Sequence, residues 1–140
     1  MIEFIYNTAF VLDNEKSIKD WLHSLAHSEG FEIKNLLYNY VSAEKIHSIN
    51  NQFLKHDYPT DVIAFDYCEG KLISGEVFIC QTVVNQNAKE HSQTIENETL
   101  RVLCHALFHL CGYKDKVSKD LHVIRSAEDK ALASFQRTYK

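Results

Sequence analysis

Hydrophobic and polar positions along this chain repeat with two different periods. In some segments apolar residues alternate with polar ones, as in a strand, and in others they recur every three or four residues, as on one helix face. The predicted strands cover residues 2–7, 35–41, 62–67 and 75–79. The predicted helices lie between Ser17 and Gly30, from Ser42 onward, and over 81–91, 95–111 and 118–137. The order β-α-β-α-β-β-α-α-α indicates an α+β fold in which helices pack on one sheet.

The same pattern predicts details of packing and domain organisation. Residues 62–67 contain few polar positions, so we expect this strand inside the sheet, in a hairpin that turns at Glu69-Gly70. The helix after Ser42 should turn Ile46, Ile49 and Phe53 inward. No repeat, low-complexity tract or Pro/Gly-rich linker interrupts the chain, which predicts one domain over residues 1–140.

Composition narrows the class of protein. Hydrophobic residues make up 45% and charged residues 24% of 140, which is typical of a folded domain. A net charge of −4 argues against a protein whose whole surface binds nucleic acid, although a local basic patch is compatible with this charge. No apolar run approaches the roughly 20 residues of a membrane span, and no basic leader precedes an apolar stretch. The four cysteines show no CxxC pairing, so we expect a reducing compartment, the cytoplasm.

The segment 100–111 contains the first candidate functional residues. It is apolar nearly all round, which predicts a buried helix, yet it carries His105 and His109. Residues four apart share a helix face, so both imidazoles can point at one ion. Gly112 should end the helix and let Asp115 return to the same face. Two histidines and a carboxylate suit Zn²⁺ and leave a position for water; the alternative is a buried helix whose histidines find other polar partners.

The spacing HxxxHxxGxxD is that of the longer zincin signature, with two differences. Ala106 stands where zincin proteases have their general base, and Asp115 stands where they have a third histidine. A metal at this site would have to activate its own water or use a base from elsewhere, so no catalytic residue is assigned. Glu128 falls within the apolar stripe of the last helix; we expect it to reach the solvent edge, the alternative being a carboxylate that holds a ligand histidine.

Three ordered stretches resemble the YbeY family, the metal-dependent rRNA-maturation endoribonucleases of bacteria. Residues 105–115, HALFHLCGYKD, are similar to the family's HGxLHLxGYDH. Residues 49–65, which include Pro59-Thr60-Asp61, are similar to LNxxYRxKDxPTDVLSF, and Gly75-Glu76-Val77 match the family's GDI strand. The resemblance covers about residues 35–137 in order and spacing.

The chain departs from the family pattern at several functional positions. Asp115 occupies the place of the third histidine ligand, Leu54 that of a family arginine, and Ala106 that of a glycine. A guanidinium suits phosphate contacts and leucine does not, so neighbouring Lys55 is a candidate substitute. Lys55 and Lys116 are therefore the candidate substrate-binding residues, as point charges for RNA phosphates.

The resemblance implies a mixed four-stranded sheet with one antiparallel strand, surrounded by helices. It also implies one Zn²⁺ or another divalent ion per chain, a cytoplasmic location, and action with the small ribosomal subunit on the 3′ end of 16S rRNA and in ribosome quality control. The other hypotheses are a minimal zincin-type metalloprotease, which the absence of Glu at position 106 disfavours, and a non-enzymatic ribosome assembly factor with a structural metal. The oligomeric state is left open.

Overall fold

The computed structural model describes residues 1–139, and over that range four strands and five helices follow the predicted order. The elements are β1 (Ile2–Tyr6), α1 (Glu15–Ser28), β2 (Glu32–Tyr40), α2 (Ala43–Leu54), β3 (Val62–Asp66), β4 (Leu72–Ile79), α3 (Gln81–Glu90), α4 (Ile95–Leu110) and α5 (Ser118–Thr138). The helix start predicted at Ser17 is wrong, because α1 begins two residues earlier, at Glu15. β2 and β4 each begin three residues earlier than the pattern indicated.

The sheet has the strand order β1-β2-β4-β3. β1, β2 and β4 are parallel, and β3 is antiparallel to β4, which confirms the mixed sheet with one antiparallel strand. The prediction that β3 lies inside the sheet is wrong, because it forms an edge. Its apolar character has another origin: Ile63 is 3% exposed beneath α2, while Ala64, on the opposite side of the strand, is exposed. Burial of one face therefore gives β3 its apolar character, although the strand lies at the edge of the sheet.

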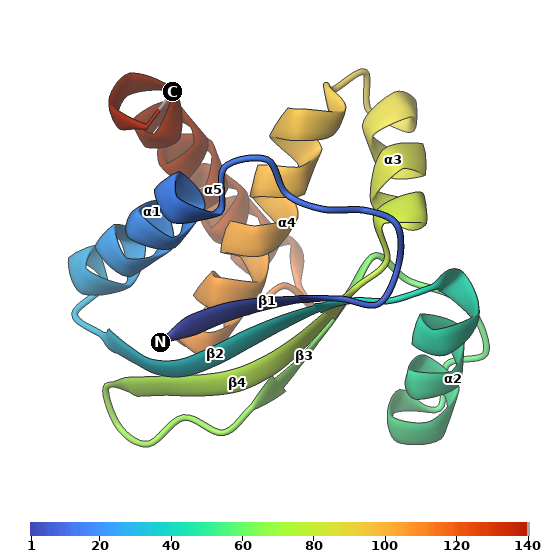
Figure 1. Cartoon of the computed structure of the whole chain (residues 1–140). Helices are drawn as coiled ribbons and strands as arrows, with labels where there is room; N and C mark the ends of the chain where they lie inside the picture. The colour runs from blue at the N-terminus through green and yellow to red at the C-terminus, as the bar shows by residue number, and fades with distance from the viewer. Residues whose placement is uncertain (140) are drawn as a thin grey trace.

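Helices α1, α4 and α5 cover one side of the sheet, as Figure 1 shows, and α2 lies apart from them. Alternate residues of β4 are buried against this layer, so the strand has one core face. Hydrogen bonds also join polar side chains to backbone inside the core. The Trp21 indole donates to the Ala131 carbonyl at 2.9 Å, and the Tyr38 hydroxyl donates to the Leu103 carbonyl at 2.9 Å. The apolar helix α4 is thus enclosed on most sides, as predicted.

Helix α2 packs in a second, smaller cluster. Ile46 and Ile49 are buried there, as predicted, but Phe53 is 57% exposed, so its inward placement is wrong. The Phe53 ring meets Phe65 edge-on at 5.5 Å, and this contact covers only one side of it. Phe53 lies in the last turn of α2, where the chain leaves for the loop before β3, and helical spacing alone does not reveal that the covering layer ends there.

A close approach between α4 and the sheet depends on Gly75. A Cβ atom at this position would lie 2.9 Å from the Phe65 carbonyl oxygen and 3.0 Å from a methyl group of Leu110. Both distances are shorter than a normal contact between non-bonded atoms. Gly75 therefore allows the C-terminal end of α4, where His109 precedes Leu110, to rest directly on β4 and β3.

The lengths and compositions of the helices show whether any of them could span a membrane. The most apolar helix, α4, has 16 residues, and the longest, α5, has 21 but carries charged residues along its length. Across residues 1–139, the structure contains no helix that combines the length and the apolarity of a membrane span.

Candidate metal centre

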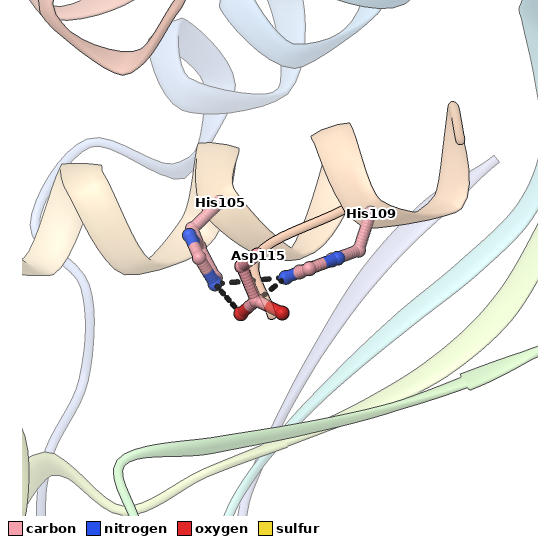
Figure 2. A group of neighbouring side chains, drawn as sticks. All are labelled: His105, His109 and Asp115. Atoms are coloured by element: carbon pink, nitrogen blue, oxygen red, sulfur yellow. Dashed lines mark hydrogen bonds and ion pairs between the residues drawn. The ribbon is translucent and has the colours of Figure 1, made fainter. Parts of the chain in front are cut away.

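Helix α4 brings His105 and His109 together on its one open side. Thr94 caps the helix by accepting a hydrogen bond from the Asn97 amide at 3.0 Å. One turn apart, the two imidazole rings meet edge to face with centroids 4.5 Å apart, and their Nε2 atoms are 3.0 Å apart. Their side chains are 25% and 28% exposed, so both histidines are accessible to solvent although most of the helix is buried. Figure 2 shows the two side chains on α4.

The turn after α4 carries Asp115 back to the histidines, as predicted. Gly112 has a φ of +102°, a left-handed conformation that favours glycine, and the Tyr113 amide donates back to the Phe108 carbonyl at 3.0 Å. Asp115 Oδ2 then lies 3.1 Å from His109 Nε2 and 3.7 Å from His105 Nε2. Figure 2 shows the three side chains pointing toward one another.

The hydrogen bonds of the other ring nitrogens indicate which tautomer each histidine adopts. His109 Nδ1 donates to the Tyr113 carbonyl at 2.9 Å, and His105 Nδ1 donates to Glu128 Oε2 at 2.5 Å. A neutral imidazole that donates from Nδ1 presents a lone pair at Nε2. Two such nitrogens and a carboxylate oxygen lie within 3.7 Å of one another, an arrangement that a cation between them would stabilise.

The separations of these three atoms fit one metal ion. Two ligands each about 2.0–2.1 Å from a tetrahedral Zn²⁺ lie about 3.3 Å apart. The observed separations are 3.0, 3.1 and 3.7 Å, which bracket that value. Nitrogen and oxygen donors of this kind suit Zn²⁺ and other divalent ions, and three protein ligands leave room for a water or a substrate oxygen. The cluster of His105, His109 and Asp115 can therefore hold a metal.

Glu128 on α5 does not reach the solvent edge, so that prediction is wrong. Its side chain is 1% exposed, and it accepts hydrogen bonds from His105 and from Arg101 Nη1, the latter at 2.9 Å. Burial by itself lowers the pKa of Arg101, but the hydrogen bonds to Asp129 and Glu128, together with the negative charges of these two residues, outweigh it, so the pKa is raised above its usual value. The opposite charge of Arg101 explains why a carboxylate can be buried at this point.

The remaining candidate residues lie at several places around the fold. Lys116, next to Asp115, and Lys55, at the end of α2, are both exposed. Lys55 adopts a left-handed conformation, with a φ of 59°. Ala106 is 1% exposed in the core, so the residue after the first histidine faces away from the cluster. Asp61 orders the loop before β3, because Thr60 and Asn87 both donate to its carboxylate, at 3.3 and 3.4 Å.

A mixed sheet beneath a helix that carries two histidines, with an aspartate in the turn that follows the helix, defines an α+β protein with a candidate metal centre. Comparisons with known proteins narrow this class. The family model described as Endoribonuclease YbeY matches residues 6–136 of the chain, and the chain therefore belongs to the YbeY endoribonuclease family.

Three curated relatives, each named Endoribonuclease YbeY, illustrate the match. The protein of Flavobacterium johnsoniae is 43% identical over 96% of this chain and 97% of its own length. That of Phocaeicola vulgatus is 40% identical over 85% and 86%, and that of Cytophaga hutchinsonii is 40% identical over 93% and 92%. Among solved structures, the solution structure of TM1509 from Thermotoga maritima aligns with a TM-score of 0.68 at 26% identity, and covers 99% of this chain and 94% of that one.

Proposed function

We propose that this chain is a metal-dependent endoribonuclease that matures the 3′ end of 16S rRNA, with His105, His109 and Asp115 as the ligands of one Zn²⁺. The observation that carries the proposal is the convergence of two Nε2 atoms and a carboxylate oxygen within 3.0–3.7 Å. Each imidazole is held by a hydrogen bond at its other nitrogen, as is usual for histidines that bind metals.

Each residue of the proposed site has a distinct role. A bound divalent ion supplies a water of lowered pKa and offsets charge on the scissile phosphate. His105 and His109 offer neutral nitrogen ligands, while Asp115 brings a negative charge where the family pattern has a third histidine. Exposed Lys116, adjacent to Asp115 in the chain, contacts an RNA phosphate, and Lys55 contributes a second positive charge from the end of α2. Because Ala106 is buried and aliphatic, the chain lacks the general base that zincin proteases place there.

The proposed partners follow from this substrate. The chain acts in the cytoplasm on rRNA associated with the small ribosomal subunit, as one domain over residues 1–140. With a net charge of −4, the chain attracts RNA through local cations, such as Lys116 beside Asp115, rather than through its whole surface.

Metal analysis combined with RNA cleavage tests the proposal. Purified protein should contain about one zinc ion per chain, and His109→Ala should lose it. The zinc-loaded protein should cleave a precursor RNA that spans the 3′ end of 16S rRNA, and chelator treatment or His109→Ala should abolish cleavage. His122→Ala, which removes an exposed histidine of α5, is the matched control and should cleave normally.

The other outcomes would favour different functions. Well-folded protein without bound metal would contradict both the nuclease and the protease hypotheses. Hydrolysis of peptides by the zinc-loaded protein would favour the metalloprotease. Zinc and ribosome binding without RNA cleavage would favour an assembly factor whose metal is structural. Cleavage that persists unchanged in His105→Ala would indicate a contaminating nuclease.

A further inference from the structure

The buried carboxylate of Glu128 serves two elements at once. Glu128 belongs to α5, while both of its partners, Arg101 and His105, belong to α4. Its two oxygens are divided between them: Oε1 accepts from Arg101 Nη1 at 2.9 Å, and Oε2 accepts from His105 Nδ1 at 2.5 Å. With 1% of its side chain exposed, Glu128 has little access to water, so these two donors replace its hydration.

We infer that Glu128 is the positioning residue of the metal centre: it fixes the orientation and tautomer of His105, and Arg101 in turn holds Glu128. This inference rests on the proposed metal binding at His105, His109 and Asp115. A hydrogen bond from Nδ1 to a fixed carboxylate leaves the imidazole ring with one orientation, and that orientation points Nε2 at His109 Nε2, 3.0 Å away. Carboxylate–histidine–metal arrangements of this kind also raise the basicity of the ligand nitrogen.

A purely structural role explains the arrangement less well. Burying an ion pair contributes little net stability, because the cost of removing both charges from water offsets their attraction, and well-packed apolar residues often do as well. Apolar residues of both helices, among them Leu103, Ile124 and Phe135, already lie in one hydrophobic core. What apolar packing cannot supply is a hydrogen-bond acceptor at His105 Nδ1, and Glu128 places one there.

Arg101 holds the carboxylate through the geometry of its side chain. Its side chain is 16% exposed, and while Nη1 donates to Glu128, Nη2 donates to Asp129 Oδ1 at 2.8 Å. A guanidinium engaged at two nitrogens has little freedom to rotate, so Glu128 Oε1 is held in place. Asp129 is 67% exposed and accepts from Arg101 Nη2. Glu128 and Asp129 are therefore adjacent acids that share one arginine, and only Glu128 contacts a proposed ligand.

This adjacency provides a matched pair of variants. Glu128→Gln and Asp129→Asn each replace a carboxylate by an amide of the same shape and change the net charge equally, and the amide oxygen introduced by Asp129→Asn can still accept from Arg101 Nη2. At Glu128 the amide must present its NH₂ group either to Arg101 or to His105, both of which are donors, so one hydrogen bond is lost. The zinc affinity of the full chain should be measured after metal removal, by competition with a chromophoric chelator. Glu128→Gln should weaken zinc binding about 10–100-fold, and Asp129→Asn by less than about threefold.

Two further measurements separate positioning from stability. Urea unfolding of the metal-free proteins reports on folding alone, and ¹⁵N NMR of the imidazole reports the tautomer of His105, which should be Nδ1–H in the wild type and mixed in Glu128→Gln. If Glu128→Gln lowers stability but binds zinc as tightly as the wild type, the role is structural and the inference is overturned. The same holds if the tautomer does not change.

The remaining outcomes also distinguish positioning of His105 from a purely structural role. If Glu128→Gln does not fold, Glu128→Asp keeps the charge but shortens the side chain; a weaker zinc affinity with an altered His105 tautomer supports positioning, and an unchanged affinity and tautomer overturn it. If the wild-type protein binds no zinc, the proposed function fails. The inferred orientation of His105 by Glu128 can still be tested in that case, because the NMR measurement does not require metal.

Discussion

Asp115 is the proposed ligand whose loss we expect to be most informative, because the family pattern has a histidine there. It lies in the turn after α4 with 37% of its side chain exposed, so Asp115→Ala should leave the core intact. The structure places its oxygen 3.1 and 3.7 Å from the two histidine nitrogens, within the range for one shared ion. Asp115→Ala should therefore weaken zinc binding while the two histidines remain in place.

The size of the effect follows from the number of ligands. Structural zinc sites with four protein ligands bind with about 10–16 kcal/mol, or about 2.5–4 kcal/mol for each ligand. At about 1.4 kcal/mol per tenfold change, the loss of one ligand weakens binding about 10²–10³-fold. Asp115 is partly exposed, and water can take its place at the metal, so we expect a value near the lower end of this range.

Zinc affinity should again be measured by chelator competition, with far-UV circular dichroism to verify the fold. Asp120→Ala, which removes another acid five residues further along, is the control and should bind zinc within about threefold of the wild type. A dissociation constant for Asp115→Ala within the same threefold limit would remove Asp115 from the ligand set, and would leave His105 and His109 as a site completed by water or by another side chain.

Two further predictions concern stability. Gly75→Ala should lower the free energy of unfolding by about 1–3 kcal/mol in urea denaturation, because its Cβ atom would lie 2.9 Å from the rigid Phe65 carbonyl; an unchanged value would contradict the close packing. Burial, followed by the hydrogen bond to Glu29, raises the pKa of Tyr113 to about 12. Since the folded pKa lies above the ordinary value near 10, the contribution of Tyr113 is fully present below about pH 10 and is lost as the pH rises toward about 12. Urea unfolding across this range should show a smaller decline for Tyr113→Phe than for the wild type, and equal declines would contradict the assignment.

The local features of the fold were predictable from the sequence because local forces produce them. Helical spacing and apolar content located α4, and the offset of four placed His105 and His109 on one face, since 3.6 residues make one turn. Gly112 marked the end of the helix because few other residues adopt its left-handed conformation at low cost. The return of Asp115 toward the histidines followed from that turn, and the structure brings the three side chains together.

What only the tertiary structure decided involves residues far apart in the chain. The apolar pattern of β3 showed that one of its faces is covered but not that it lies at the edge of the sheet, and the spacing of α2 did not show that the packing layer ends before Phe53. Glu128 lies 23 residues beyond His105, outside any local motif, and it is buried because Arg101 meets it across the interface of α4 and α5. A sequence pattern records whether a side chain favours burial, whereas the partner that a buried charge finds depends on how closely packed elements meet.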